Sequence, residues 1–399
     1  MRVRQELVIE PAQSWARLQQ LKNSEWFVHD LEEQLKENHR LFLEELMRYE
    51  RQQHLGVAPY ERDPARADQG NGFYQRTLLT RLGPMELAVP RSRSGLFQTQ
   101  VLRRYQRREA AVDEALRKVF LLGVSTRQTG PALATLLDEA VSAATVSAVS
   151  KVLDETVAAW HRRALSDTYR YLILDGVSVR IRLVGKVQRR VALCAYGIKE
   201  DGKRELIDFL LVRSESEAHW RSLLEELWRR GLQGTKLKLI STDGHPGLLA
   251  ALELVWPRVA LQRCWVHKLR NVAAKLKRSQ QQQCLQEAKL IYQASTRREA
   301  ISRFRIWSAR WRGQAERAVR CLELDLEQLL AFYDCPQAHW KRLRTTNVIE
   351  RLFVEVRRRI RTMCAFTTRD SCERILFSVF DRMNTHWRKH PLKTFTQNN

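Results

Sequence analysis

Two apolar segments in the middle of the chain end in the same way, and this repeat constrains the fold more than any other feature. The run 171–174 is followed by Asp175 and a glycine, and the run 237–242 is followed by Asp243 and a glycine. A short apolar run bounded by a turn signal is typical of a buried strand. Since ligands of α/β sheets bind beyond the carboxyl ends of the strands, we expect both carboxylates at one rim of a sheet.

The residues around these runs predict a mixed-sheet α/β domain. Three apolar segments joined by short turns predict antiparallel strands, and strands then alternate with amphipathic helices. From residue 267 to about residue 388 the periodicity is helical, and no strand is expected there. The predicted strands cover residues 171–179, 186–196, 205–212, 237–243 and 260–264, and the helices between them cover 214–232 and 247–254.

A long helix is predicted near the start, over residues 24–53. Its apolar residues recur at helical spacing, while acidic and basic residues alternate on its other faces. Such a helix is either a self-association arm or a helix packed on its own domain, and the sequence leaves both open. The apolar positions are Leu31, Leu35, Phe42, Leu46 and Tyr49.

A small hairpin and a basic helix are predicted next. Alternating segments over 73–81 and 85–89 flank a Gly83-Pro84 turn, which is typical of two short antiparallel strands. The following residues, 101–122, have helical spacing and carry four arginines near their start. Basic loops beside short strands often contact phosphates, although charge that only keeps the surface hydrated explains them nearly as well.

Two further helices have the pattern of a helix-turn-helix. The first is expected to begin near Ser125, with Gly130-Pro131 delaying or interrupting it. Ser142 is a good N-cap for the second, over 143–158. The helix-turn-helix motif of DNA-binding proteins consists of a helix, a short turn and a second helix, and here the second helix begins with small polar residues. The alternative is a packed pair of helices that does not contact DNA.

The charge of the chain points to a polyanionic partner. Lys and Arg number 69 against 45 Asp and Glu, a net charge of +24. Arginine's planar guanidinium suits two-point contact with phosphate, so nucleic acid is the expected partner and a merely solvated basic surface is the alternative. The seven cysteines are scattered, and no apolar run is long enough for a membrane span. A cytoplasmic, nucleoid-associated protein without a membrane partner is therefore expected.

Three carboxylates are candidate metal ligands. Two aspartates at one buried sheet rim repel each other, and a divalent cation resolves that repulsion; oxygen ligands suit Mg²⁺ or Mn²⁺. Glu350, on an arginine-rich helix, is the best candidate for the third ligand. The alternative is that Glu350 only pairs with an arginine on its own helix.

Four motifs in order give the chain a resemblance to a known family. They are Asp175 in its strand, Ser241-Thr242-Asp243-Gly244, Arg263-Cys264-Trp265-Val266-His267 with Arg270-Asn271, and Arg344-Thr345-Thr346-Asn347-Val348-Ile349-Glu350-Arg351. The chain resembles the Mutator-like bacterial insertion-sequence transposases from about residue 72 to residue 387. The motifs Pro90-Arg91-Ser92-Arg93, Arg103-Arg104-Tyr105 and Gly123-Val124-Ser125-Thr126-Arg127 extend the resemblance upstream.

The resemblance implies a ribonuclease-H-like catalytic core, which an all-helical insertion interrupts before its last acidic residue. Asp175, Asp243 and Glu350 would form the catalytic triad and hold two Mg²⁺ or Mn²⁺ ions for DNA cleavage and strand transfer. The expected regions are an N-terminal helical arm and linker at 1–72, a DNA-binding hairpin and helix-turn-helix at 73–165, core parts at 166–269 and 341–399, and the insertion at 270–340.

The pair Cys264 and His267 admits three interpretations. With Cys335 and His339 it could form a zinc site, although a long helical stretch intervenes. A packed cysteine beside an ordinary histidine is the second. In the family this motif lies next to the active site, which implies that His267 is catalytic and contacts the scissile phosphate or orients the nucleophile.

The DNA contacts implied by the resemblance lie mostly on arginines in its motifs. The expected partners are the terminal inverted repeats of the element and target DNA, held by a homodimer because two ends must be paired. A tryptophan of the insertion could stack on a flipped base, although such residues are more often core. The expected DNA-binding residues are Arg103, Arg104, Arg127, Arg263, Arg270, Arg344, Asn347 and Trp311.

The sequence departs from the family pattern at a few positions, and it leaves two other functions open. Phe353 and Met363-Cys364 stand where related chains often carry polar residues, so local DNA contacts are not expected there. A non-catalytic DNA-binding protein or repressor would keep the basic surface but would not need the triad. A ribonuclease-H-like nuclease without strand transfer would not need the long insertion or the N-terminal region.

Overall fold

The computed structural model describes residues 24–58, 61, 63–64, 66–122, 124, 126–361 and 364–396. The chain divides into two compact units. The first comprises Met1–Phe120 with Ser125–Ser150, and the second comprises Leu121–Val124 with Lys151–Asn399. Residues 1–23 of the predicted arm, Ser125 with its predicted capping role, and Met363 lie outside the described residues.

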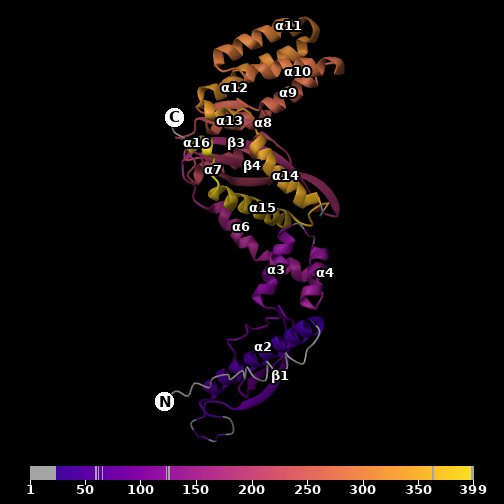
Figure 1. Ribbon diagram of the computed structural model, residues 1–399. Helices are drawn as coiled ribbons and strands as arrows, with labels where there is room; N and C mark the ends of the chain where they lie inside the picture. Colours follow the sequence, from indigo (N-terminus) through magenta and orange to yellow (C-terminus); the bar gives the residue numbers. More distant parts are fainter. Residues whose placement is uncertain are drawn as a thin grey trace. The chain divides into compact units, whose positions relative to one another are not determined.

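The first unit is built on a long helix and a hairpin (Figure 1). Helix α2 (Ser24–Leu55) confirms the predicted long helix, and strands β1 (Gly70–Thr80) and β2 (Gly83–Ser92) confirm the hairpin. One face of α2 packs on the hairpin through Met47, and the Glu44 carboxylate accepts a hydrogen bond from the Ala88 amide at 2.9 Å. The buried side chains of this core are Met47, Leu78, Met85, Leu87, Val89 and Leu102.

The helix predicted over 101–122 is wrong in its first part. Helix α3 (Ala110–Leu121) begins only at Ala110. The residues before it run along β1, because the Leu79 amide donates to the Arg107 carbonyl at 2.8 Å and the Glu109 amide donates to the Leu79 carbonyl at 2.9 Å. Backbone groups used in this way cannot form helical hydrogen bonds. The arginines before α3 therefore lie on a loop.

The expected interruption at Gly130-Pro131 is also wrong. Helix α4 (Thr126–Leu137) runs through both residues, although proline removes one helical hydrogen bond. A Cβ at Gly130 would lie 1.8 Å from the Val141 carbonyl oxygen, so only glycine allows the following turn to approach the helix this closely.

The second predicted helix begins where expected. Ser142 caps α5 (Ala143–Lys151) by accepting a hydrogen bond from the Thr145 amide at 3.2 Å. The helix is shorter than predicted, because α5 ends at Lys151 and α6 (Leu153–Arg162) follows as a separate helix.

The second unit contains a mixed five-stranded sheet in the order β5-β4-β3-β6-β7. The first three strands pair antiparallel, and β3, β6 and β7 pair parallel. All five predicted strands are confirmed, and the first is longer than predicted because its pairing continues to Leu183, opposite Lys186. The strands are β3 (Tyr169–Leu183), β4 (Lys186–Lys199), β5 (Arg204–Val212), β6 (Leu239–Thr242) and β7 (Ala260–Arg263).

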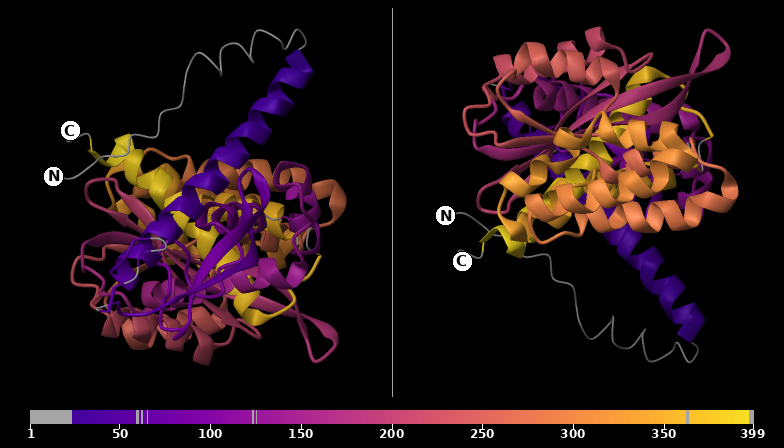
Figure 2. Two further views of the ribbon diagram at one scale, coloured as in Figure 1. Left: turned by 90° about the horizontal axis from the view of Figure 1, so that it is seen from below. Right: turned by 90° about the horizontal axis from the view of Figure 1, so that it is seen from above.

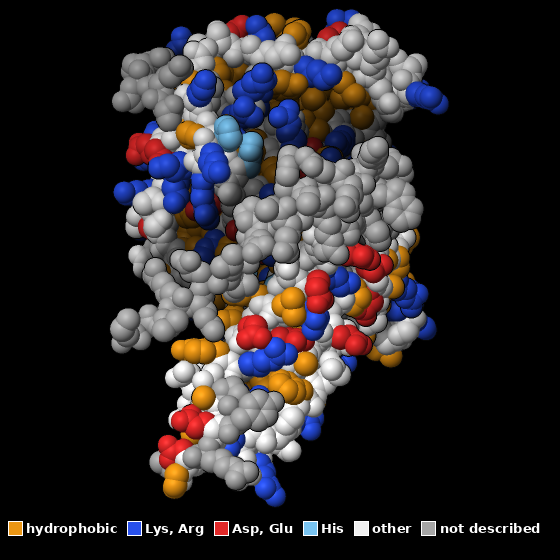
Figure 3. Space-filling view, turned by 60° about the horizontal axis from the view of Figure 1, so that its bottom comes forward, with side chains coloured by type: hydrophobic (Ala, Val, Ile, Leu, Met, Phe, Trp, Pro, Cys, Tyr) orange, Lys and Arg blue, Asp and Glu red, His pale blue; other side chains and the backbone are white. Residues whose placement is uncertain are grey.

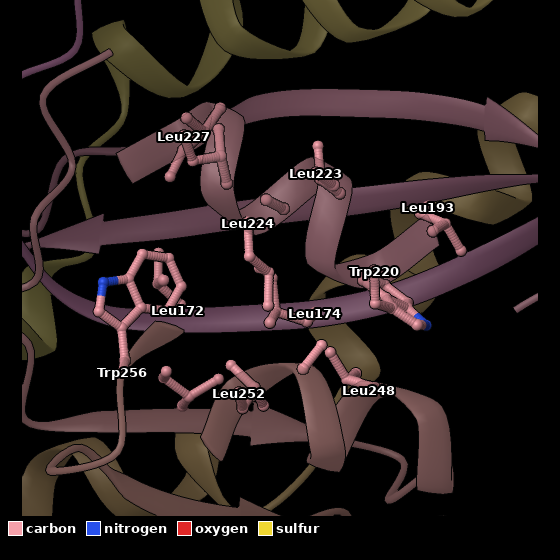
Figure 4. Close-up of a cluster of buried hydrophobic side chains, with 14 of the residues drawn as sticks. Leu172, Leu174, Leu193, Trp220, Leu223, Leu224, Leu227, Leu248, Leu252 and Trp256 are labelled. Atoms are coloured by element: carbon pink, nitrogen blue, oxygen red, sulfur yellow. The ribbon is translucent and has the colours of Figure 1, made fainter. Parts of the chain in front are cut away.

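Helices α7 (Glu217–Arg229) and α8 (Pro246–Val255) cover one face of this sheet. Their apolar sides meet leucines of β3 and β4 in a continuous core (Figure 4). Removing such side chains from water is the main favourable contribution to folding. Among the residues buried here are Leu172, Leu174, Leu193, Trp220, Leu223, Leu224, Leu227, Leu248, Leu252 and Trp256.

The opposite face carries α14 (Asn347–Arg361) and α15 (Arg369–Lys389). Asn384 of α15 fastens this layer, because its side chain accepts from the Leu206 amide at 2.8 Å and donates to the Leu206 carbonyl at 3.0 Å. Phe209 and Phe380 pack edge to face beside it. Residues of β3 alternate between the two faces, so Asp175 points to this side, opposite to Leu174.

Helices fill the segment between the sheet and α14. The helices α10 (Arg278–Tyr292) and α11 (Arg297–Glu323) lie side by side (Figure 2). The helical prediction from residue 267 is confirmed over the described residues, with one correction: Phe366 forms an isolated bridge with Ile181 beside β3. The other helices are α9 (Trp265–Ala273), α12 (Leu326–Leu330), α13 (Trp340–Leu343) and two 3-10 turns, Ala331–Asp334 and Gln337–His339. None of the helices described is both long and apolar enough to cross a bilayer.

The double hydrogen bond of Asn384 predicts a large loss of stability on truncation. Asn384→Ala leaves a buried amide and a buried carbonyl of β5 without partners, so we expect the free energy of unfolding to fall by about 2–4 kcal/mol. Urea unfolding measures this change. Thr385→Ala, at an exposed position of the same helix, is the control, and an equal effect of both variants would contradict the role of Asn384.

Candidate active site

The register of two parallel strands brings Asp175 and Asp243 together. In the β3–β6 pair, Leu174 is the partner of Thr242, so the two aspartates follow at the same rim of the sheet. Asp175 is 9% exposed, and its Oδ1 accepts a hydrogen bond from the Gly176 amide at 2.7 Å. Oδ1 of Asp243 accepts from the His245 amide at 2.9 Å. The prediction that these two residues meet is confirmed, but Asp175 does not end its strand: only the pairing with β6 stops there, while β3 continues to Leu183 and Asp175 pairs with Cys194 of β4.

The electrostatics of Asp175 reflect this crowding. Burial raises the pKa of Asp175 to about 7, and the negative charge of Asp243 is the next cause. Glu350 acts in the same direction, while the hydrogen bond from Gly176 and the charge of His267 oppose it. One buried carboxyl group therefore senses two other carboxylates and one cation.

Glu350 reaches the site because the segment before α14 lies across the ends of β6 and β7. Ser241 Oγ donates to the Leu343 carbonyl at 2.8 Å, and the Trp265 amide donates to the Arg344 carbonyl at 3.0 Å. The segment leads directly into the first turn of α14, where half-buried Glu350 lies 3.5 Å from His267 Nε2. Glu350, which follows Asp243 by 107 positions (350 − 243), is thus held beside His267 and near enough to Asp175 to raise the pKa of Asp175.

Cys264 and His267 lie in contact next to the carboxylates. Burial raises the pKa of the Cys264 thiol, but hydrogen bonds with His267 and Thr346 outweigh burial and lower it; the Thr346 amide lies 3.3 Å from Sγ. The contact with Cys264 raises the pKa of His267 to about 9, and the charges of Asp175 and Asp243 contribute less. The raised pKa favours the protonated form of His267 at neutral pH.

The zinc interpretation of this pair has no support in the structure. The His339 ring stacks on Phe395, with 3.8 Å between ring centroids, and lies 3.0 Å from the Tyr171 hydroxyl. In the described part of the chain, no three His, Cys, Asp or Glu side chains form a metal-ligating group. This holds for Asp175, Asp243 and Glu350 as well. The charges of Asp243 and Glu350 raise the pKa of Asp175, but the three side chains do not converge as metal ligands in this conformation.

A fourth carboxylate, Glu215, was missed in the sequence. It lies in the connection after β5, and its Oε1 is 2.8 Å from where a Cβ on Gly176 would stand. Burial raises the pKa of Glu215, and Asp243 is the next cause. Strand β5 runs in the same direction as β3, so its carboxyl end meets the same rim. An acidic residue shortly after a third such strand was the signal that could have identified it.

The residues predicted to bind DNA fall into two groups. Arg263 is held by Asp325 and Arg344 donates to the Tyr292 carbonyl at 2.9 Å, so both are engaged within the protein. Trp311 is only 4% exposed and donates to Glu287 at 2.8 Å, which favours the alternative interpretation of a core residue. The other predicted contacts, Arg103, Arg104, Arg127, Arg270 and Asn347, are exposed.

A basic cavity of about 1080 Å³ lies within the first unit. The loop before α3 forms one wall, and Ser142 and Thr145 at the start of α5 form another. Tyr105 on this loop is 79% exposed and has a φ of +62°, a strained conformation for a bulky residue. The sequence did not reveal the cavity, because the loop has helical spacing. Its arginines are Arg76, Arg91, Arg104, Arg107 and Arg108.

Basic side chains are widespread outside this cavity as well. Figure 3 shows Lys and Arg side chains over the described surface of one face, with acidic side chains between them. Together, the mixed sheet, the acidic side chains beside β3 and β6 and the basic surfaces define an α/β protein whose described surface is rich in Lys and Arg.

Comparison with known proteins identifies the family. The model of the family described as "Transposase, Mutator family" matches residues 10–390. A transposase of insertion sequence ISRM5 from Rhizobium meliloti is 37% identical over 88% of each chain. That of IS406 from Burkholderia multivorans is 36% identical over 87% of this chain and 90% of its own. That of IS256 in transposon Tn4001 from Staphylococcus aureus is 34% identical, covering 86% and 88%. The chain belongs to the Mutator family of transposases.

The raised pKa of Asp175 predicts a pH-dependent effect of neutralising it. In the folded state the carboxyl stays protonated up to about pH 7, whereas the ordinary pKa is 3.8, so this group lowers stability as the pH rises between these values. Asp175→Asn removes the effect. Without divalent ions we expect its melting temperature to exceed that of the wild type, more at pH 8 than at pH 5, with a gain of at most about 4 kcal/mol.

Exposed Asp381→Asn is the control for this experiment. Thermal unfolding in the presence of a chelator at both pH values measures the difference. A stabilisation that is equal at pH 5 and pH 8 would contradict the electrostatic explanation.

Proposed function

We propose that this protein is a DNA transposase that cuts the ends of its insertion sequence and joins them to target DNA through Asp175, Asp243 and Glu350. The observation that carries the proposal is the parallel register of β3 and β6, which sets the two aspartates side by side at one rim. The order of the strands, three antiparallel and two parallel, supports a ribonuclease-H-like core.

The chemistry of the three carboxylates fits divalent metal ions, and binding would require their side chains to converge from the positions described above. Burial raises the pKa of Asp175 beside Asp243, and a nearby cation offsets both the burial and the repulsion. Carboxylate oxygens suit Mg²⁺ or Mn²⁺, and Asp175, Asp243 and Glu350 would hold the ions. When bound, the ions supply activation of the attacking oxygen and stabilisation of the leaving oxygen. The backbone donors Gly176 and His245 keep the two aspartates oriented.

His267 acts through its positive charge. Its Nε2 is 3.5 Å from Glu350 Oε1, so the imidazolium orients this carboxylate and balances part of the acidic charge. A cation at this position also attracts a DNA phosphate to the site. Water then breaks a phosphodiester at the end of the element, and the freed 3′-hydroxyl attacks a phosphodiester of the target. No covalent intermediate with the protein is required.

The first unit binds the terminal repeats in this proposal. Helices α4 and α5, joined by a short turn, would form the helix-turn-helix, and Ser142 and Thr145 at the start of α5 face the basic cavity. Residues 143–150 contain only alanine, threonine, valine and serine, so Lys151 at the end of α5 is the one long side chain of this helix that could read bases. The exposed arginines of the loop before α3 are the main phosphate contacts.

Cleavage of a labelled DNA that carries the element's terminal repeat tests the catalytic proposal. Asp175→Asn, Asp243→Asn and Glu350→Gln should each retain DNA binding and lose cleavage and joining by about a thousandfold or more in Mg²⁺, as expected when an essential catalytic group is removed. Glu355→Gln, on the same helix as Glu350 but paired with Arg358, should remain active.

Two outcomes would contradict the proposal. A wild-type protein that binds the repeat but does not cut it in Mg²⁺ or Mn²⁺ is a non-catalytic DNA-binding protein. Cleavage without joining of the freed end identifies a nuclease.

The cavity of the first unit predicts a change in the salt dependence of DNA binding. Removing two phosphate contacts by Arg104→Ala with Arg107→Ala should weaken binding and reduce the slope of log affinity against log salt by about 2. Fluorescence anisotropy across a salt series measures the slope. The control is Arg298→Ala, at an exposed position of α11. An unchanged slope in the double variant would show that the cavity does not contact phosphates.

A further inference from the structure

The joined ends of β3 and β4 form a two-stranded arm that extends past the rest of the sheet. Pairing between β4 and β5 begins only at Val191, so residues 186–190 of β4 pair with β3 alone. Figure 2 shows this closed end of the hairpin, in magenta, projecting beyond the helices of the second unit. Residues 180–190 are here called the β3–β4 arm.

The β3–β4 arm is a paired ribbon that is fastened to the second unit. Its cross-strand pairing continues as far as Leu183 opposite Lys186. On the outer edge of β3, the Arg182 amide donates to the Phe366 carbonyl at 2.8 Å, and the Phe366 amide donates to the Arg180 carbonyl at 2.9 Å. Phe366 is buried, so the arm is held to within two residues of its turn. A segment that is ordered in advance loses less conformational entropy when it binds a partner.

Positive charge is concentrated on one face of the arm. Residues 180–190 include five basic and no acidic residues, a net charge of +5 (5 − 0). Arg180 and Arg189 are direct partners across the two strands, although like charges placed opposite each other are unfavourable. Arg182 is exposed on the same face, two residues along the strand. No ion pair among the described residues involves Arg180 or Arg182, so their charge is available to a partner.

The turn of the arm carries a valine in a strained conformation. Val184 has a φ of +48° and Gly185 a φ of +77°, so both residues of this two-residue turn are in the left-handed region. Such turns favour Asn-Gly, and a β-branched residue is an outlier there. Val184 is also 100% exposed, so it gains nothing from packing. Because strain of this kind clusters where proteins hold ligands, Val184 is a candidate contact residue.

Protection of a sheet edge is the other explanation for charge on the arm. Charged side chains prevent an exposed edge, such as residues 186–190, from pairing with strands of other molecules. That role requires neither charges of one sign nor a strained apolar residue at the turn. A polyanion accounts for both features, since its phosphates attract the arginines and its interior offers an apolar residue a contact.

We propose that the β3–β4 arm is a further DNA-binding element, whose arginine face contacts backbone phosphates while Val184 enters the major groove. A two-stranded ribbon fits the width of this groove. Val184 follows Asp175 by nine residues (184 − 175) of extended chain, which span about 30 Å at most. This span is shorter than one turn of duplex DNA, about 34 Å. The arm therefore contacts DNA within one turn of a strand cut at Asp175, an inference that rests on the proposed function.

Photo-cross-linking of the full-length protein in a chelator tests the position of the turn without requiring catalysis. Benzoylphenylalanine placed at Val184 should cross-link either to a labelled terminal-repeat duplex, within about 10 base pairs of the end, or to a labelled target duplex. The labelled strand shows which of the two DNAs the arm holds. The same group placed at Leu254 of α8, which is 60% exposed, should not cross-link. Binding of both duplexes without a cross-link from Val184 would overturn the proposal.

The salt dependence of DNA binding tests the arginine face. Arg180→Ser with Arg182→Ser should reduce the slope of log affinity against log salt by about 2. The matched control is Arg221→Ser with Arg229→Ser, at exposed positions of α7. An unchanged slope in a protein that still binds DNA would overturn the role of the arm alone, whereas a wild type that binds no DNA would overturn the proposed function as well. Aggregation of the arm variant with an unchanged slope would assign the arginines to edge protection.

Val184→Asn separates stability from binding at the turn. Asparagine suits the left-handed position before Gly185, so the melting temperature should rise, while loss of the apolar contact should weaken DNA binding by about threefold or more. Thermal unfolding and fluorescence anisotropy measure the two effects. A stabilised variant that binds DNA as tightly as the wild type would contradict the entry of Val184 into the groove.

Discussion

The parallel pairing of β3 with β6 is the constraint on which the site depends. Leu174 opposite Thr242 forces the next residue of each strand, Asp175 and Asp243, to share one rim, and one of them is buried. Two negative charges in such a place are unfavourable. The surroundings reduce the unfavourable energy in two ways, because Asp175 holds its proton to about pH 7 and the His267 cation lies nearby.

Hydrogen bonds between distant segments complete the site. Ser241 and Trp265 bind the carbonyls of Leu343 and Arg344, and buried Thr346 contacts Cys264. These contacts anchor the start of α14 at the rim whatever the length of chain between α9 and α14. A helical segment can therefore be inserted there without moving Glu350, and such tolerance is expected where both ends of an insertion are fixed.

The errors of prediction share a physical cause. Residues 101–109 have helical spacing, but their backbone groups bind Leu79 of β1 and so form a loop. Proline predicted a break at Pro131, but α4 runs through this residue, and the Val141 carbonyl packs closely against Gly130 beside it. Local propensity is a weak preference, and tertiary contacts override it.

The sequence by itself determined the strands, most helices and the pairing of Asp175 with Asp243 as neighbours, because hydrophobic periodicity is local; it did not show that β3 continues past Asp175 to Leu183. Periodicity also identified the apolar residues of α2, and the order of motifs pointed to the family. Only the tertiary structure decided that Glu350 meets His267, that Glu215 stands beside Gly176 and that Trp311 is buried. These facts depend on contacts between residues far apart in the chain, and the spacing of residues along a sequence carries no record of such contacts.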